Sequence, residues 1–161
     1  MTAERTEKTV CENRKARHDY EILETVEAGL VLTGTEVKSL RLGRAQLRDS
    51  YARIDRGEIF LHDAHISPYP GGGHFNHDPV RPRKLLLHRR EIDRLAGRVA
   101  EKGLTLVPLR LYFNRRGIVK VELALARGRK AYDRRAAIAE REARRRIEQA
   151  LAERARRRER E

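Results

Sequence analysis

The chain is poor in the residues that build disulfides, aromatic stacking platforms and membrane spans. Its 161 residues include one cysteine, three phenylalanines, five tyrosines and no tryptophan. A single cysteine excludes an internal disulfide and favours a reducing compartment. The sequence has no apolar run long enough to cross a bilayer and no apolar core of a signal peptide at its start. We therefore expect a cytoplasmic protein with no membrane partner.

The patterns of common catalytic and metal sites are missing as well. The sequence has no serine elbow, no phosphate-binding glycine loop and no cysteine–histidine signature. Its histidines include the pairs His62/His65 and His74/His77, each three residues apart. Residues three apart on a strand point to opposite faces, and the second pair lies in a loop without a cysteine nearby. We predict no enzyme activity, no cofactor and no metal site.

Positive charge is what the chain has in excess. Lys and Arg number 37 against 24 for Asp and Glu, which gives a net charge of +13. Residues 127–161 hold 14 basic and 7 acidic residues, so this segment carries +7 and residues 1–126 carry +6. Two basic regions indicate a polyanionic partner such as nucleic acid. The alternative is a solvated surface with a solubilising tail.

Three regions differ in composition. Residues 1–13 are polar and without periodicity, and we predict that they are disordered. Residues 14–127 contain the apolar periodicities of a folded domain. The basic tail, 128–161, has only a thin apolar stripe, with Glu140–Arg144 and Glu153–Arg157 as favourable pairs four residues apart. Such a stripe cannot hold a helix firmly, so we expect disorder or fraying in solution and a helix on a polyanionic surface.

The folded region has mainly strand patterns. We predict strands at 20–32 (interrupted at 28–29), 49–55, 58–66 and 85–87, a long loop at 67–84, and helices at 33–42 and 88–102. The first helix begins with Thr33 and Glu36 at capping-box spacing. About six strands with two short helices favour a mainly β fold with flanking helices, a small six-stranded antiparallel barrel of the oligonucleotide-binding (OB) type. A two-layer sheet-and-helix domain is the alternative.

The clearest hairpin lies at 107–125. Apolar residues alternate on both strands, which predicts one inward-facing set: Val107, Leu109, Leu111, Phe113, Val119, Val121, Leu123 and Leu125. The same alternation directs Arg110, Lys120 and Glu122 outward. Basic clusters lie at 13–18, on the helix at 33–42, at 81–84 and at the hairpin tip. With so few aromatic residues, this surface suits the phosphates and shape of folded RNA better than stacked single-stranded bases.

Several blocks together resemble one bacterial family, the SsrA-binding proteins (SmpB). The blocks are NRKARHDY at 13–20, LTGTEVKSLR at 32–41, DSY at 49–51, AHISPY at 64–69, DP at 78–79, RPRKLLL at 81–87 and GRKAYDRR at 128–135. The resemblance covers about residues 13–145 in one unbroken order. The resemblance implies a six-stranded OB-type barrel with flanking helices, in agreement with the fold expected from the residues.

The resemblance also implies a function in trans-translation. A protein of this kind binds transfer-messenger RNA (tmRNA) at its tRNA-like domain and brings it to stalled bacterial ribosomes, within an alanyl-tmRNA complex that includes elongation factor Tu. Its tail occupies the decoding centre of small-subunit rRNA and the empty mRNA channel, so that the incomplete polypeptide is tagged for degradation. From the residues alone, an rRNA-binding ribosome assembly or structural protein remains the alternative.

Two groups of residues follow from the family motifs. The tmRNA-binding group is Arg14, Lys15, Arg17, His18, Glu27, Lys38, Arg41, Leu86 and Lys120. We interpret Leu86 as a core residue that shapes the barrel, and Glu27 as an acceptor for nucleotide edges or as a residue that orients an arginine. The group for the decoding centre and mRNA channel is Gly128, Arg129, Lys130, Tyr132, Asp133, Arg134 and Arg135, with residues 136–161 as a helix along the channel.

Overall fold

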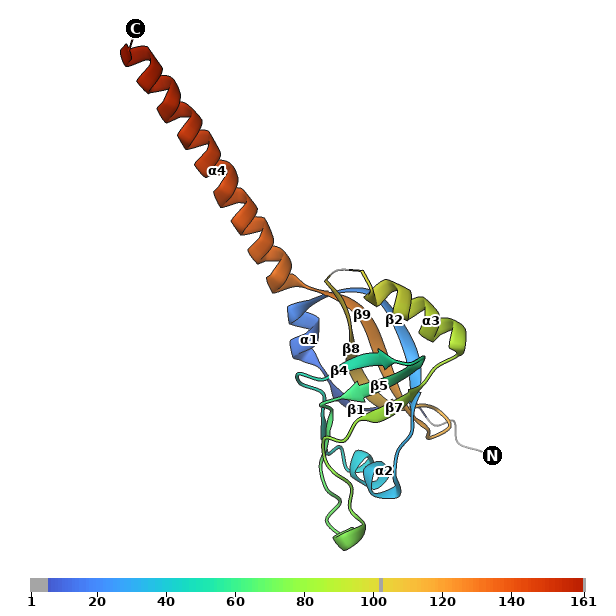
Figure 1. Cartoon of the computed structure of the whole chain (residues 1–161). Helices are drawn as coiled ribbons and strands as arrows, with labels where there is room; N and C mark the ends of the chain where they lie inside the picture. Colours follow the sequence, from blue (N-terminus) through green and yellow to red (C-terminus); the bar gives the residue numbers. More distant parts are fainter. Residues whose placement is uncertain (1–5, 102, 161) are drawn as a thin grey trace. The chain divides into compact units, whose positions relative to one another are not determined.

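The structure is a computed structural model that describes residues 6–101 and 103–160, without the side chains of 130–137. It contains two compact units, Met1–Gly128 and Arg129–Glu161. The strands are β1 (Lys8–Glu12), β2 (Tyr20–Leu30), β3 (Ala45–Gln46), β4 (Tyr51–Asp55), β5 (Glu58–His62), β6 (His65–Ile66), β7 (Arg83–Leu86), β8 (Leu104–Phe113) and β9 (Val119–Gly128). The helices are α1 (Arg14–Asp19), α2 (Gly34–Arg41), the 3₁₀ turn η1 (Gly73–Phe75), α3 (Arg89–Val99) and α4 (Arg129–Arg160) (Figure 1).

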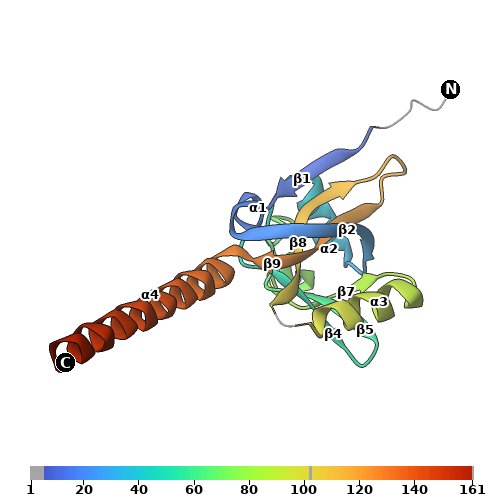
Figure 2. The same ribbon diagram turned by 90° about the horizontal axis from the view of Figure 1, so that it is seen from above.

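The main sheet returns on itself. Its strands pair in the order β1-β8-β4-β5-β7-β2-β9, and β9 also pairs with β8. All these pairings are antiparallel. Strands β8, β4, β5, β7, β2 and β9 therefore form a closed ring, with β1 added beside β8 (Figure 2). The expectation of a mainly antiparallel β fold with flanking helices is confirmed.

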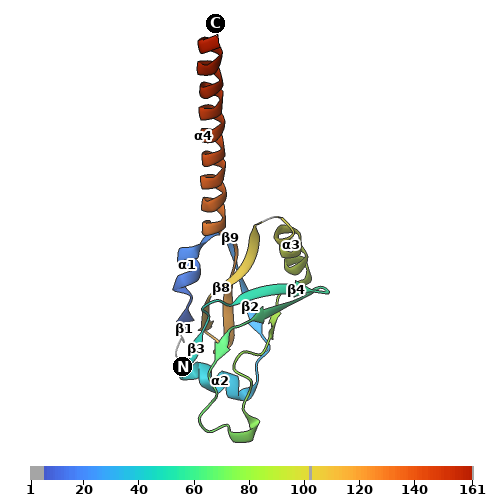
Figure 3. The same ribbon diagram turned by 60° about the vertical axis from the view of Figure 1, so that its left-hand side comes forward.

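Helices α2 and α3 lie at different ends of this ring (Figures 1 and 3). Leu40 of α2 and Ile92 and Leu95 of α3 are buried in the main hydrophobic core. The α3 helix ends at Val99 with Ala100 as its C-cap, earlier than the predicted end at residue 102. Gly103, with a φ of +88°, therefore lies in the turn after the helix and does not cap it. Both predicted helices of this unit are present, because each has an apolar face of helical period that the ring can bury.

The prediction of disorder up to residue 13 is wrong for the described part of that segment. β1 pairs with β8, and its central residues Val10 and Cys11 pack against the core. Burial raises the pKa of the Cys11 thiol to about 11, so the thiol stays protonated at neutral pH. A short polar-looking strand forms here because β8 supplies a ladder of hydrogen-bonding groups.

The hairpin contains a β-bulge that changes which residues point inward. Pro108 pairs with Leu123 and Arg110 with Glu122, so Leu109 is the extra residue of β8. Beyond the bulge, Leu111 faces the main core as predicted. Val107, before the bulge, and Leu109, at the bulge, face the other side and pack in a second cluster with Ala16 of α1. The prediction that all eight apolar residues share one face is therefore wrong for Val107 and Leu109.

A fully buried ion pair connects α2 to β7. Glu36 and Arg83 are each 0% exposed, and Arg83 Nε donates a hydrogen bond to Glu36 Oε2. The other carboxylate oxygen, Oε1, accepts from the backbone N–H of Thr33 at 2.8 Å and from Arg81. Arg83 was expected in a solvent-facing basic cluster, and that expectation is wrong because its charge is neutralised inside the protein.

The same arginine holds the long loop before β7. Arg83 Nη1 donates to the carbonyl of Ala64 at 2.7 Å, and Nη2 donates to the carbonyl of Pro79 at 3.0 Å. His77 is also buried, and its ring nitrogens contact the Thr35 hydroxyl at 2.9 Å and the Ile66 carbonyl at 2.8 Å. The loop thus has few apolar contacts but is anchored to α2 and β6 by polar ones.

Burial alone would raise the pKa of the Glu36 carboxyl. Hydrogen bonds from Arg81, from the Thr33 backbone and from Arg83 outweigh that effect and lower the pKa below its ordinary value. Desolvation lowers the pKa of the Arg83 guanidinium, although its bond to Glu36 acts in the opposite direction. Both groups remain charged at neutral pH, because an arginine pKa starts so far above it.

The second unit is the single helix α4, Arg129–Arg160. Its side chains are exposed from Ile138 to Arg160. Arg144 pairs with Glu140 at 3.1 Å, as predicted. The predicted pair of Glu153 with Arg157 does not form among the described side chains. The sequence led us to expect fraying here. Continuous helix instead follows from the many Ala, Arg and Glu residues, which have high helix propensity. Across the described residues, no helix is long and apolar enough to span a membrane.

We expect Arg83→Met to lower the free energy of unfolding by at least about 3 kcal/mol, because it leaves the Glu36 carboxylate buried without its main partner. The double variant Glu36→Gln/Arg83→Met should recover part of that loss. The matched control is Lys84→Met on the next residue. Lys84 forms an exposed pair with Glu58 at 3.3 Å, so this change should cost less than about 1 kcal/mol. Equal losses in chemical denaturation for Arg83→Met and Lys84→Met would contradict the assignment.

The lowered pKa of Glu36 predicts a pH dependence. A carboxyl whose folded pKa lies below its unfolded value stabilises the fold fully above the ordinary value of 4.5 and loses that contribution as pH falls through the folded pKa. The free energy of unfolding of the wild type should therefore fall more steeply below pH 4.5 than that of Glu36→Gln. Urea denaturation from pH 7 to pH 3 measures both slopes, and identical slopes would refute the prediction.

Candidate RNA interface

Helix α1 is positioned by one buried side chain, Asn13. Its Oδ1 accepts from the backbone N–H of Ala16 at 3.1 Å and so caps the helix. Its Nδ2 donates to the carbonyls of Leu47 at 3.1 Å and Pro108 at 2.9 Å. With Ala16 buried against the sheet, the remaining residues of this short helix face outward, and Asn13 fixes the direction in which they point.

The predicted binding residues of α1, Arg14, Lys15, Arg17 and His18, are all exposed. Lys15 Nζ lies 2.6 Å from Asp49 Oδ1, and this contact lowers the pKa of the Asp49 carboxyl. Arg17 lies 3.7 Å from Glu122, and His18 Nδ1 lies 3.0 Å from Asp19. Arg14 has no acidic partner among the residues that the structure describes, so its charge is the most available for an incoming phosphate.

Gly29 of β2 aligns two of the predicted residues in one row. It pairs with Leu86 of β7 on one side and with Lys120 of β9 on the other. Paired residues of neighbouring strands place their side chains on the same face, so Leu86 and Lys120 lie on either side of the glycine. A Cβ at Gly29 would lie 3.3 Å from the Leu86 Cβ, which is a tight contact. Glycine therefore leaves room for the Leu86 side chain to pack against the backbone of β2.

Glu27 lies two residues before Gly29 and shares its face. It accepts a hydrogen bond from the hydroxyl of Tyr112, whose ring carries the Arg110 guanidinium 3.9 Å from its centroid. Burial, and next the Glu27 carboxylate, raise the pKa of the Tyr112 hydroxyl, so it remains a donor. Glu27 was interpreted either as an acceptor for nucleotide edges or as a residue that orients an arginine. In the structure its hydrogen-bond partner is the Tyr112 hydroxyl.

Arg110 and Glu122 connect this row to α1. Arg110 Nε lies 2.7 Å from Glu122 Oε2, and Arg110 Nη2 lies 3.4 Å from Glu7. The hydrogen bond with Glu122 raises the pKa of Arg110. Because Glu122 also faces Arg17, the cations of α1 and the outer strand residues form one continuous surface. We call this surface the outer face; the buried Tyr112 supports it from below, and it consists of Arg14, Lys15, Arg17, His18, Glu27, Leu86, Arg110, Lys120 and Glu122.

The interpretation of Leu86 as a core residue is wrong. Its side chain is 51% exposed, whereas the preceding residue, Leu85, is 1% exposed and lies in the core. A strand alternates its faces, so only one of two adjacent leucines can point inward. Leu86 is therefore an apolar group presented on the surface.

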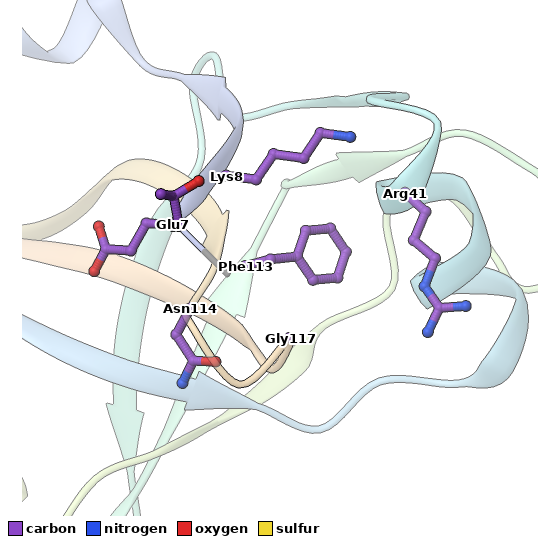
Figure 4. Close-up of a pocket in the computed structure, with 7 residues that line it drawn as sticks. Glu7, Lys8, Arg41, Phe113, Asn114 and Gly117 are labelled. Carbon is purple, nitrogen blue, oxygen red and sulfur yellow. The ribbon is translucent and has the colours of Figure 1, made fainter. Parts of the chain in front are cut away.

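Two predicted residues on α2 lie elsewhere. Lys38 Nζ lies 5.4 Å from the centre of the Tyr69 ring, in a cation–π contact with the long loop. Arg41 lines a hollow near the hairpin tip together with Lys8 and Phe113 (Figure 4). Within the described residues, neither side chain forms a hydrogen bond or an ion pair with the outer face, so the α2 cations form a separate basic region.

The tail motif falls across the boundary of the two units. Gly128 ends β9, where it pairs with Tyr20, and Arg129 begins α4. Lys130, Tyr132, Asp133, Arg134 and Arg135 are helical in the backbone, and their side chains lie outside the described residues. Among the described residues, no group of three or more His, Cys, Asp and Glu side chains could hold a metal ion.

The sequence interpretation missed Asn13 and Tyr112 as organising residues. Asn13 had a usable signal, because an asparagine three residues before a buried alanine is a helix-start pattern. Tyr112 had a weaker one, since alternation from Arg110 assigns it to the outward set. Its contact with Glu27 joins residues 85 positions apart, and no local pattern predicts such a contact.

These features define the class of the protein, a small antiparallel β domain with a basic surface for folded RNA and an arginine-rich helical extension. The SmpB protein family matches residues 10–153. An SsrA-binding protein of Moorella thermoacetica is 64% identical over 91% of this chain and 95% of its own length. That of Symbiobacterium thermophilum is 65% identical over 88% of this chain and 90% of its own length. A solved structure named "tmRNA-SmpB: a journey to the center of the bacterial ribosome" contains a chain 60% identical to this one, with a TM-score of 0.65 over 75% of this chain and 85% of that chain.

The protein belongs to the SmpB family. The match extends from β1 through the ring of strands into α4, so it includes the outer face and most of the tail.

The two adjacent leucines provide a test of the outer face. Leu85→Ala should lower the free energy of unfolding by about 2–5 kcal/mol, because it opens a cavity in the core. Leu86→Ala should cost less than about 1 kcal/mol, because the side chain is half exposed. Thermal and chemical denaturation measure both variants. A loss for Leu86→Ala as large as that for Leu85→Ala would show that Leu86 is structural after all.

Proposed function

We propose that the protein is a non-enzymatic adaptor of trans-translation that binds tmRNA at its tRNA-like domain. The observation that carries the proposal is the row Leu86–Gly29–Lys120, with Glu27 and the α1 cations on the same surface. Cations beside an apolar side chain suit a folded RNA whose phosphates and partly unstacked bases meet at one place. Membership of the SmpB family and the likeness to the tmRNA-SmpB structure support this assignment.

In this proposal the outer face is the tmRNA site. Arg14, Lys15, Arg17 and His18 contact phosphates, while Leu86 and Lys120 contact nucleotides on either side of Gly29. Glu27, held by Tyr112, accepts hydrogen bonds from nucleotide edges. Lys38 and Arg41 add a second basic contact from α2. We further propose that the closed ring of strands is a six-stranded barrel of the OB type, a fold that often binds nucleic acid.

The tail has a separate function in this proposal. At 1.5 Å per residue, the 32 residues of α4 span about 48 Å. An arginine-rich helix of that length suits an empty mRNA channel lined by phosphates, whereas an intact message would exclude it. Gly128, Arg129, Lys130, Tyr132, Asp133, Arg134 and Arg135 would lie at the decoding centre. The protein would act in the cytoplasm, on small-subunit rRNA, together with elongation factor Tu in the alanyl-tmRNA complex.

Truncation after Gly128 tests the division of functions. This boundary keeps the pairing of Gly128 with Tyr20 and the whole core of the first unit. The truncated protein should bind tmRNA with near wild-type affinity but should not support peptide tagging on stalled ribosomes. Both proteins should bind tmRNA more tightly than an ordinary tRNA at the same salt concentration, since charge alone would not discriminate.

Two outcomes would contradict the proposal. Normal tagging by the truncated protein would remove the function of the tail. Equal affinity of the full chain for tmRNA and tRNA, with constant co-purification with ribosomes that lack tmRNA, would favour a ribosome assembly or structural protein.

A further inference from the structure

A hollow of about 740 Å³ lies away from the outer face, where three segments of the first unit meet. Its lining comes from the start of β1, from Arg41 at the end of α2 and from the tip of the β8–β9 hairpin. The lining residues are Thr6, Glu7, Lys8, Arg41, Phe113, Asn114 and Gly117. Figure 4 shows the Phe113 ring between Lys8 and Arg41, with Glu7 and Asn114 on the other side.

The two cations of this hollow are not neutralised by the protein. Lys8 and Arg41 have no carboxylate partner in the part of the chain that the structure describes. Lys15, Arg17 and Arg110, in contrast, each face a carboxylate within 3.7 Å. Unpaired cations in a concave site attract an anionic group more strongly than paired ones, because no internal ion pair must be broken first.

Phe113 adds an apolar aromatic surface to this charged hollow. The residue is half-buried, so part of its ring packs on the core and part remains accessible. Adjacent strand residues point to opposite faces, so Phe113 and Tyr112 serve different surfaces. An accessible aromatic ring in a basic hollow is the combination that stacks a nucleobase and holds its phosphate.

Asn114 contributes a polar group with a defined orientation. Its Oδ1 accepts from the backbone N–H groups of Arg116 at 3.0 Å and Ile118 at 2.9 Å. The acceptor side of the amide is therefore engaged by the hairpin tip, and Nδ2 forms no hydrogen bond within the described residues. The Glu7 carboxylate points away from the ring and pairs with Arg110 at 3.4 Å, so it does not neutralise Lys8 or Arg41 (Figure 4).

The hollow is formed by ordered backbone. Lys8 pairs directly with Phe113 in the β1–β8 ladder, which fixes the cation beside the ring. The hairpin tip is closed by Asn114 N–H to Ile118 O at 2.9 Å and by Gly117 N–H to Asn114 O at 2.9 Å. Arg41 lies in the last turn of α2, the helix that the buried Glu36 holds in place.

We propose that this hollow binds one unstacked nucleotide of an RNA, with its base on Phe113 and its phosphate between Lys8 and Arg41. Its volume is in the range of small-molecule sites. The inference rests on the proposed function in taking RNA as the ligand, and it adds a nucleotide site separate from the outer face. The nucleotide comes from either tmRNA or ribosomal RNA, and the experiments distinguish these sources.

The aromatic contact is tested with Phe113→Leu, which keeps apolar packing but removes the stacking surface, and with Phe113→Trp, which retains it. Phe75→Leu is the matched control, because Phe75 is 91% exposed and lies outside the hollow. Affinity of the full chain is measured for the isolated tRNA-like domain of tmRNA and for the small ribosomal subunit. Phe113→Leu should lose about tenfold in affinity for one of the two RNAs, while Phe113→Trp and Phe75→Leu bind as the wild type does.

The charged contact is tested with Lys8→Gln and Arg41→Gln against the exposed control Arg53→Gln. Each of the first two variants should lower the slope of log affinity against log salt by about one, because one phosphate contact is lost. Arg53→Gln should leave the slope unchanged. The affected RNA should be the same one that responds to Phe113→Leu.

Direct binding is measured by amide NMR shifts with uridine 5′-monophosphate, uridine and ribose 5-phosphate as probes. The nucleotide should shift Lys8, Phe113, Asn114 and Gly117 at lower concentration than either half of the molecule. If Phe113→Leu and Phe75→Leu behave alike on both RNAs, or the nucleotide shifts residues elsewhere, the proposal is wrong. Wild-type discrimination of tmRNA from tRNA would still stand in that case, so failure of this site is distinguishable from failure of the proposed function.

Discussion

The buried carboxylate of Glu36 is the interaction on which the surroundings of α2 depend. It completes the capping box of the helix through Thr33 and holds the guanidinium groups of Arg81 and Arg83. Arg83 in turn binds the carbonyls of Ala64 and Pro79, so one charge pair connects a helix, a strand and a long loop. A buried ion pair does not by itself add much stability, but it fixes a geometry, because any other arrangement leaves a charge without a partner.

Two kinds of cation follow from this arrangement. Arg83 and Arg110 are held by carboxylates and shape the protein, whereas Arg14, Lys8 and Arg41 have no such partner in the described residues. A large positive charge therefore says little about where a polyanion binds. The binding surfaces are those where a cation is positioned by backbone or by packing and its charge is left for a ligand.

Local patterns predicted the parts of the fold that depend on local physics. The capping box of α2, the apolar face of α3 and the β8–β9 hairpin all follow from short spacings in the sequence. The pairing of β1 with β8 and the burial of Arg83 depend on residues far apart, and propensity does not contain that information. The exposed face of Leu86 became clear only once the register with Gly29 was known, although the family motif had already singled out this residue.

The bulge at Leu109 gives β8 one residue more than the paired segment of β9, so the length of β8 determines which of its residues face inward. The extra residue lets Val107 and Arg110 lie on the same side of the sheet, Val107 under α1 and Arg110 beside Glu122, although three positions separate them. Removing Leu109 would close the bulge and keep the downstream faces, because Pro108 and Arg110 already lie opposite the adjacent residues Leu123 and Glu122. Removing one residue more would exchange the interior and exterior for everything downstream of it. The number of residues in β8 therefore decides which side chains face the core, in addition to the chemical nature of each residue.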